Sequence, residues 1–180
     1  MNKVIAVVGM SGSGKSVATE TLEKQGWHKI YLGGITYQKM KEAGITITPD
    51  SEKVFREDLR KKHGPECYAR FILPEIEKVT RTNDIVLDGL YSWYEYKFLE
   101  EHLKENLKVI CIVTDKNLRY ERIANRPERP FNYQKVKERD ISEIENLYKG
   151  GPIAYADYYI INNGTLEEYK KRLDEIIKQI

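Results

Sequence analysis

Cysteine is scarce in this chain, and long apolar runs are missing from it. Cys67 and Cys111 are the two cysteines among 180 residues, and their spacing fits neither a disulfide framework nor a metal-ligand motif. We therefore expect two reduced thiols in a cytoplasmic protein. No run approaches the roughly 18 apolar residues of a membrane-spanning helix. The apolar start is too short for a signal peptide, so we expect no membrane association.

The chain also lacks a large excess of positive or negative charge. Thirty Lys and Arg residues face 28 Asp and Glu residues, which leaves a net charge of +2. This balance argues against a dedicated nucleic-acid-binding or membrane-surface protein. Internal repeats, low-complexity tracts and linkers are lacking as well. The length predicts a single domain over residues 1–180, as a monomer or a homodimer.

The most informative motif lies near the start. Residues 9–16 read GMSGSGKS and match the phosphate-binding loop pattern G-x-x-x-x-G-K-[ST]. The apolar run 3–8 predicts a buried strand, and the pattern over 15–25 predicts a helix. Lys15 then supplies charge to the β- and γ-phosphates of a nucleotide such as ATP, and the Ser16 hydroxyl suits Mg²⁺. The residues expected to cradle the phosphates are Gly12, Ser13, Gly14, Lys15, Ser16 and Val17.

Short apolar runs alternate with longer helical periods along the rest of the chain. This alternation predicts an α/β fold with a parallel sheet and crossover helices. The remaining expected strands span residues 28–32, 84–88, 107–113 and 157–161. The remaining expected helices span residues 35–43, 51–62, 65–80, 92–104, 115–126, 133–148 and 165–179. Ser92 to Glu95 and Thr165 to Glu168 have the spacing of helix capping boxes.

Asp88 ends the predicted strand 84–88, and Gly89 follows it. Ligands of open parallel sheets bind beyond the carboxyl ends of the strands. A carboxylate there can face the Mg²⁺ bound by Ser16, directly or through water. We therefore expect Asp88 to be a metal-shell or catalytic residue.

Three arginines have helical spacing. Arg119, Arg122 and Arg126 fall within roughly a 60° arc of one helix face. Such a face can contact the oxygens of a transferring phosphoryl group, or it can be a solvated face paired with nearby acids. The two prolines at 127 and 130 predict a short lid over about residues 126–134. Arg129 and Arg139 are weaker candidates for the same role.

A second group of arginines lies in the segment 35–80, where we expect the helices that bind the phosphoryl acceptor. Arg56 and Arg60 are one helical turn apart, and Arg70 lies in the next predicted helix. Arginine can grip a phosphate with two parallel hydrogen bonds, although solvated positions are an alternative for these three. Gly33, after the second strand, would let the backbone approach an acceptor closely, and a plain turn is the alternative for this position.

These motifs together resemble the nucleotide-kinase branch of P-loop proteins, namely dephospho-CoA kinase and, more closely, an archaeal group of adenylate-kinase-related proteins. The motifs that carry the resemblance are GMSGSGKS, Leu59-Arg60 with Gly64, Asp88-Gly89, the three spaced arginines, Arg139-Asp140, Ala156-Asp157 and Asn162-Asn163-Gly164. The resemblance implies a three-layer sandwich with a five-stranded parallel sheet in the order 2-3-1-4-5. It also implies ATP and Mg²⁺ as cofactors, with Asn163 and Gly164 near the adenine.

Two positions depart from these families. Dephospho-CoA kinases carry an Asp after the second strand, where this chain has Leu32-Gly33-Gly34. The archaeal group has an arginine near its equivalent of Asp88, and Tyr91 replaces it here. A hydroxyl acceptor benefits from a positioned base, whereas a phosphate acceptor is already anionic. The missing acid therefore favours a nucleoside monophosphate over dephospho-CoA as the small-molecule acceptor, unless Asp88 is the base.

Two other functions are alternatives to kinase activity. One is an ATP-binding regulatory module without turnover, which Tyr91 in place of an arginine leaves open. The other is a GTPase-type switch, which lacks support because neither an N-K-x-D nor a D-x-x-G motif is present.

Replacing Lys15 by alanine tests the nucleotide site. The variant is expected to lose phosphoryl transfer by orders of magnitude while it keeps its fold, because the ammonium acts most strongly on charge in the transition state. Turnover of ATP and the circular dichroism spectrum measure the two effects. Near wild-type turnover in a folded Lys15→Ala protein would contradict the assignment.

Overall fold

The computed structural model describes residues 2–127 and 130–180. Its centre is a five-stranded sheet in which every neighbouring pair is parallel, in the order β2-β3-β1-β4-β5. The strands are β1 (Val4–Val8), β2 (His28–Tyr31), β3 (Ile85–Asp88), β4 (Leu107–Val113) and β5 (Tyr158–Ile161). The predicted fold class and strand order are confirmed. All of β1 is buried, as expected of a central strand with both faces covered.

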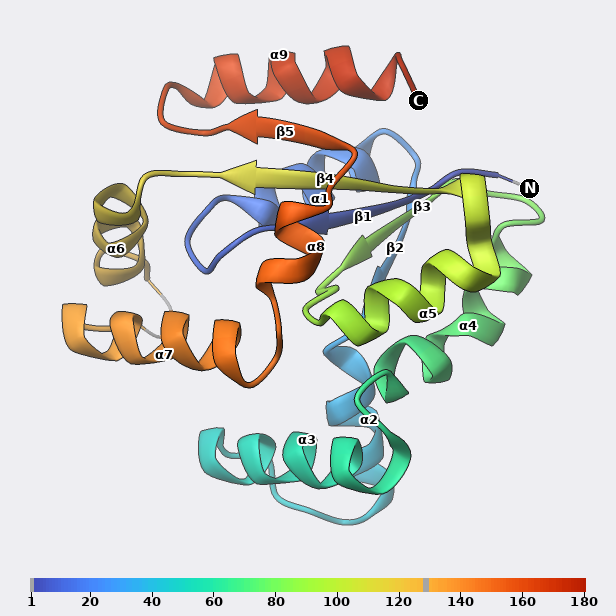
Figure 1. Ribbon diagram of the computed structural model, residues 1–180, viewed down its shortest axis with the longest axis vertical. Helices are drawn as coiled ribbons and strands as arrows, with labels where there is room; N and C mark the ends of the chain where they lie inside the picture. Colours follow the sequence, from blue (N-terminus) through green and yellow to red (C-terminus); the bar gives the residue numbers. More distant parts are fainter. Residues whose placement is uncertain (1, 128–129) are drawn as a thin grey trace.

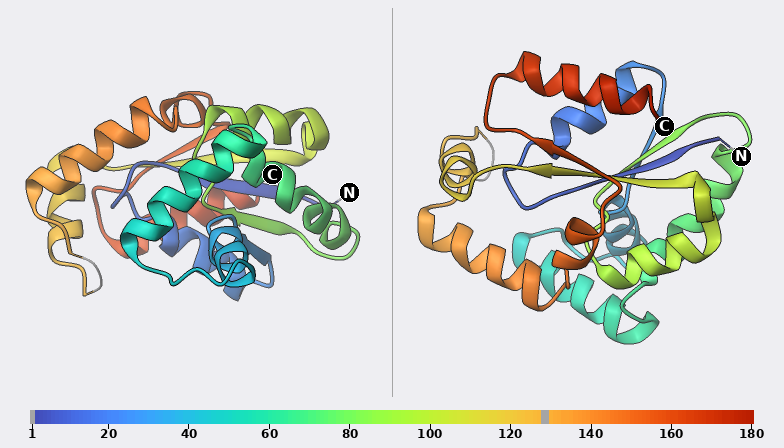
Figure 2. Two further views of the ribbon diagram at one scale, coloured as in Figure 1. Left: turned by 90° about the horizontal axis from the view of Figure 1, so that it is seen from below. Right: turned by 45° about the horizontal axis from the view of Figure 1, so that its top comes forward.

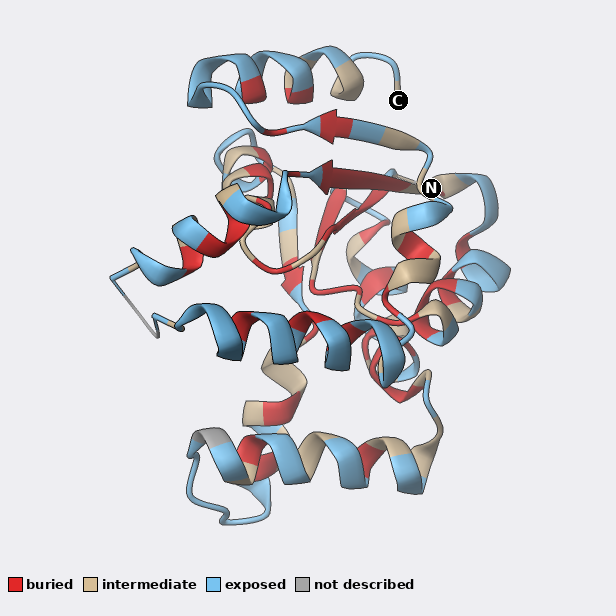
Figure 3. Ribbon diagram, turned by 60° about the vertical axis from the view of Figure 1, so that its left-hand side comes forward, coloured by how far each residue is buried: buried red, intermediate tan, exposed pale blue. Residues whose placement is uncertain are grey.

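Two helical layers cover the sheet (Figures 1 and 2). Alternate β1 residues point to opposite faces, so Ile5 and Val7 pack with α1 (Lys15–Lys24) and α9 (Leu166–Ile177). Val4 and Ala6 face the larger core, which α4 (Cys67–Val79) and α5 (Trp93–Leu103) close from the other side. Figure 3 shows that the central strands β1, β3 and β4 are mostly buried, whereas the edge strands β2 and β5 are partly exposed.

Three helices connect β2 to β3, as predicted for the segment 35–80. They are α2 (Gly34–Glu42), α3 (Pro49–His63) and α4. In Figures 1 and 3, α3 lies farthest from the sheet, and most of its surface is exposed. The acceptor-binding role of this segment stays a prediction.

At the carboxyl end of the sheet, α6 (Lys116–Ala124) and α7 (Tyr133–Glu145) lie side by side (Figures 1 and 2). Tyr120 and Ile123 of α6 form a small separate core with Val136 of α7. The predicted lid over about 126–134 thus falls on the connection between the two helices and the first turn of α7. Residues 128 and 129 lie outside the described part of the chain.

Several boundaries differ from the sequence prediction. The predicted helix 115–126 ends at Ala124, because Asn125 leaves the helical conformation before Pro127. The predicted helix 133–148 ends at Glu145. The sequence analysis missed a short 3₁₀ helix (Lys104–Asn106). It also missed α8 (Gly150–Ala154), because the Gly-Gly-Pro run at its start is typical of a turn.

Two predicted capping boxes are confirmed. Ser92 and Glu95 exchange hydrogen bonds at the start of α5, and Thr165 and Glu168 do so at the start of α9. In the described part of the chain, no helix is both long and apolar enough to cross a membrane.

The core assignment predicts unequal effects of two isoleucine truncations. Ile110, on β4, is 0% exposed, so Ile110→Ala should lower the free energy of unfolding by about 2–5 kcal/mol through lost burial and a cavity. Ile144, on α7, is 50% exposed, and Ile144→Ala should stay within about 0.5 kcal/mol. Urea unfolding of the two variants measures the difference, and equal losses would contradict it.

Candidate active site

The loop between β1 and α1 depends on glycine at two positions. Gly12 and Gly14 have φ of 78° and 101°, which residues with a side chain rarely adopt. A Cβ on Gly12 would lie 2.8 Å from the carbonyl oxygen of Arg119, and one on Gly14 would collide with the side-chain amide of Asn162. The loop therefore packs its backbone directly against α6 and the end of β5.

Side chains from the second half of the chain hold the carbonyl groups of this loop. Arg119 Nη1 donates to the carbonyl of Ser11 at 2.8 Å. The carbonyl of Ser13 accepts from Asn162 Nδ2 at 2.8 Å and from Thr114 Oγ1 at 3.0 Å. The Tyr169 hydroxyl donates to the carbonyl of Gly14 at 2.9 Å.

Two features inside the loop fit a bound phosphate. Lys15 Nζ donates to the carbonyl of Met10 at 3.0 Å, and burial, followed by the charge of Lys149, lowers the pKa of Lys15 to about 7. Ser13 Oγ is buried and has no hydrogen-bond partner among residues 2–127 and 130–180. An anion with several acceptor oxygens would satisfy both groups.

A cavity of about 290 Å³ opens beside the loop. Its lining residues are Gly12, Gly14, Lys15, Ser16, Arg122, Ile123 and Arg126. The sequence analysis predicted all of them except Ile123 as site residues. Val17, the other loop residue predicted there, lies in the first turn of α1.

The predicted metal ligands come from adjacent elements. Ser16 is in the first turn of α1, and Asp88 ends β3, paired in register with Val7 of β1. Burial raises the pKa of Asp88, and the charges of Lys29 and Lys15 oppose that effect. Within the described residues, no group of three or more His, Cys, Asp or Glu side chains is placed to hold a metal ion. One hydroxyl and one carboxylate suit Mg²⁺ that takes its other oxygens from phosphates and water.

The three spaced arginines do not share one surface. Arg119 is buried and forms two hydrogen bonds with the carboxylate of Asp140, at 2.7 and 3.2 Å. Arg122 faces the cavity, and Arg126 also lines it from beyond the end of α6. Both Arg122 and Arg126 thus line the cavity, but only Arg122 does so from the helix. Arg126 lies beyond the end of α6, so the predicted helical spacing does not explain its position. Arg129 lies outside the described residues.

A cluster on α7 escaped the sequence analysis. Glu143 accepts from Lys149 Nζ at 2.6 Å, from Arg139 Nε at 2.9 Å and from Ser11 Oγ of the loop at 3.1 Å. Burial alone would raise the pKa of Glu143, but the charges of Lys149 and Arg139 bring it well below its usual range. Arg139 was a weak candidate, whereas Lys149 and Glu143 carried no motif that could have revealed them.

Tyr91 and the arginines of the segment 35–80 occupy different surroundings. Tyr91 is half-buried, loss of solvent raises its pKa, and the centre of its ring lies 4.9 Å from Lys149 Nζ. Arg60 Nη2 lies 3.4 Å from Glu95, its guanidinium covers the ring of Tyr68, and its Nε is buried with no partner in the described part of the chain.

The other two arginines of that segment pair within their own helices or turns. Arg56 pairs with Glu52 one turn earlier in α3. Arg70 is 52% exposed and bonds to Glu66 and to the carbonyl of His63. The structure thus places Arg60 in a largely buried position between Glu95 and Tyr68 and gives Arg70 a surface position, and the acceptor-binding role of both stays a prediction.

The remaining predicted residues lie at strand ends. Gly33 is the N-cap residue of α2 and lies beside the ring of Tyr31. Asn163 Oδ1 accepts from the backbone of Asp115 at 3.0 Å, and Gly164 leads into α9. The direct contact with the phosphate-binding loop comes from Asn162, one residue before the predicted pair.

Comparison with known proteins identifies the family of this chain. The family described as AAA domain matches residues 5–147. The UPF0200 protein of Sulfurisphaera tokodaii is 32% identical over 184 residues, which cover 99% of this chain and 97% of that one. UPF0200 protein TK1334 of Thermococcus kodakarensis is 31% identical over 185 residues, which cover 98% and 100%. The chain therefore belongs to the AAA-domain family and to the UPF0200 proteins.

Solved structures with low sequence identity share the fold. TT1252 from Thermus thermophilus is 16% identical, with a TM-score of 0.65 and coverage of 99% of this chain and 98% of that one. Shikimate kinase from Acinetobacter baumannii, in complex with shikimate, is 16% identical, with a TM-score of 0.60 and coverage of 99% and 93%. A gluconokinase from Sinorhizobium meliloti is 17% identical, with a TM-score of 0.57 and coverage of 98% and 94%. These likenesses show a P-loop kinase-like fold.

Substituting Arg119 and Arg122 separately tests their different surroundings. Arg119→Met should lower the free energy of unfolding by about 3–5 kcal/mol, because it leaves the buried carboxylate of Asp140 without its partner. Arg122→Met should change it by about 0.5 kcal/mol or less, since Arg122 is half-buried and faces the cavity. Urea unfolding measures both. Full stability of Arg119→Met together with weakened nucleotide binding would show instead that Arg119 binds the ligand.

Proposed function

We propose that this protein transfers the γ-phosphoryl group of ATP to a small acceptor that already carries a phosphate, with a nucleoside monophosphate as the preferred acceptor. One observation carries the proposal: at one end of the sheet, the half-buried Lys15 lies near Asp88, the carboxylate that ends β3. This arrangement supports binding of a triphosphate at the loop and of an acceptor beyond β3.

The charges around the loop support a phosphate acceptor rather than a hydroxyl acceptor. A hydroxyl acceptor needs a base, and Glu143 is unsuited because three donors already occupy its carboxylate and its pKa is low. No carboxylate follows β2, which ends at Tyr31. An anionic acceptor needs positive charge and correct placement, which arginines supply.

Each residue then has a defined role. Lys15 binds the β- and γ-phosphates, and Arg122 and Arg126 contact the oxygens of the transferring group. Ser16 and Asp88 would hold Mg²⁺, which when bound neutralises charge on the phosphates. Arg60 binds the acceptor phosphate, with Arg56 near it and Tyr91 and Gly33 beside the acceptor. The resemblance to the archaeal adenylate-kinase-related group assigns Asn163 and Gly164 to the adenine.

Dephospho-CoA is the second candidate acceptor, and one observation favours it. Burial raises the pKa of Asp88, and a more basic carboxylate is better suited to accept a proton from a hydroxyl. Turnover of Mg·ATP with a panel of nucleoside monophosphates and with dephospho-CoA separates the two. Efficient use of dephospho-CoA without monophosphate activity would overturn the preferred acceptor. Tight ATP binding without any acceptor-dependent turnover would indicate a regulatory module.

Replacing Arg60 by lysine tests the acceptor site. Lysine keeps the charge but loses the planar fork that grips a phosphate, so Arg60→Lys should raise the acceptor KM about tenfold or more and leave the KM for ATP nearly unchanged. Arg172→Lys, on the exposed surface of α9, is the matched control and should change neither constant. Steady-state kinetics with each substrate varied in turn measures the effect. An equal rise in both KM values for Arg60→Lys would contradict the assignment.

A further inference from the structure

Lys149 is one of the most deeply buried charged residues of the protein. It lies between α7 and α8, and 1% of its surface is exposed. Its Nζ donates to Glu143 Oε2 at 2.6 Å and lies 4.9 Å from the centre of the Tyr91 ring. A buried ammonium is costly unless anions or acceptors compensate it. The anions and acceptors around Lys149 therefore bear on the function of this residue.

Glu143 compensates Lys149 only in part, because the same carboxylate serves other donors. Arg139 Nε lies 2.9 Å from Glu143 Oε1, and the Ser11 hydroxyl lies 3.1 Å from that same oxygen. One negative charge thus faces two positive charges. An ammonium has three N–H donors, and Glu143 is the one hydrogen-bond acceptor for Lys149 within residues 2–127 and 130–180. The two cationic side chains around Glu143 therefore leave an excess positive charge, which a further anion would neutralise.

The position of the cluster identifies that anion. Ser11 is a residue of the phosphate-binding loop and directly follows Met10, whose carbonyl accepts from Lys15 Nζ. Tyr91 lies three residues after Asp88. Lys149 therefore lies between the outer turn of the loop and the end of β3. If the loop binds a triphosphate as proposed above, its terminal phosphate extends toward this space.

We propose that Lys149 is a second phosphate-binding lysine, which contacts the γ-phosphate of the bound triphosphate in addition to Lys15. This inference rests on the proposed function in one respect, because it takes ATP as the ligand of the loop, and it does not depend on the identity of the acceptor. Glu143 then holds the ammonium in place before the nucleotide arrives. A structural role is the competing explanation, in which Lys149 merely neutralises Glu143 and fastens α7 to the loop.

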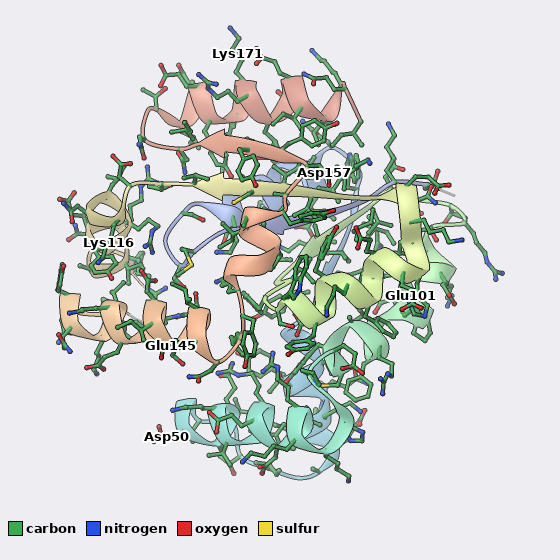
Figure 4. The ribbon with its side chains drawn as sticks, in the orientation of Figure 1. Asp50, Glu101, Lys116, Glu145, Asp157 and Lys171 are labelled. Atoms are coloured by element: carbon green, nitrogen blue, oxygen red, sulfur yellow. The ribbon has the colours of Figure 1, made fainter. Side chains whose placement is uncertain are left out.

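Nucleotide binding separates the two explanations without any acceptor. Isothermal titration with Mg·ADP and with Mg·AMP-PNP, a non-hydrolysable ATP analogue, compares ligands that differ by the terminal phosphate. Lys149→Met should weaken AMP-PNP binding about tenfold or more, because a charge-assisted hydrogen bond is lost, and should leave ADP binding within about threefold. Lys171→Met, on the far side of the molecule (Figure 4), is the matched control and should change neither affinity.

Lys149→Met alone leaves the buried carboxylate of Glu143 without its lysine partner, which could itself alter binding. The double variant Glu143→Gln/Lys149→Met has no such carboxylate, and it is compared with Glu143→Gln alone. If Lys149 binds the γ-phosphate, the double variant keeps the selective loss of AMP-PNP binding. Recovery of AMP-PNP binding in the double variant, or an equal loss for both nucleotides, would overturn the inference. A wild-type protein that binds AMP-PNP but phosphorylates no acceptor would refute the proposed kinase activity alone.

Discussion

The carbonyl groups of the phosphate-binding loop impose the main constraint on this structure. A loop that turns its amide groups toward a ligand must direct carbonyls into the protein, where each needs a donor. The donors here are side chains of Thr114, Arg119, Asn162 and Tyr169. They lie between 101 and 155 residues farther along the chain than the carbonyls they bind. The shape of the loop therefore depends on the complete fold.

The order of the strands makes these long-range contacts possible. Because β4 and β5 follow β1 in the sheet and run parallel to it, their carboxyl ends lie at the same edge as the loop. Thr114 directly follows β4, and Asn162 directly follows β5. The buried pair of Arg119 and Asp140 adds α6 and α7 to the same assembly. A topology with β4 and β5 elsewhere would leave the carbonyls of Ser11 and Ser13 without these partners.

The sequence predicted what short-range pattern determines. The loop motif, the apolar strands and the two capping boxes each depend on residues within a few positions of one another, and the structure confirms them. The strand order came from the family resemblance, since spacing alone showed only the alternation. Contacts between side chains that lie far apart in the sequence could not be predicted in this way. Arg119 and Arg122 are both arginines on one predicted helix, yet only Arg119 forms a buried ion pair with Asp140. The packing of α7 against α6 brings Asp140 to that position.

The same limit explains the cluster around Glu143 and the position of Arg60. Lys149 precedes a Gly-Gly-Pro run that is typical of an exposed turn, but the end of α7 brings it against Tyr91 and the loop. Arg60 belongs to α3, far from the sheet, yet it reaches Glu95, the buried carboxylate of the capping box of α5.

Glu95 links the acceptor segment to the phosphate-binding end of the sheet. Its Oε2 accepts from the backbone amides of Tyr91 and Ser92, at 3.0 and 3.1 Å, while its Oε1 faces Arg60 at 3.4 Å. The turn that follows Asp88 is thereby fixed by the same carboxylate that positions the arginine. Phosphoryl transfer depends on the alignment of donor and acceptor, so in the proposed function this connection between Asp88 and Arg60 would hold the two proposed binding regions in one frame. The short segment from Asp88 to Glu95 thus couples the two halves of the proposed active site.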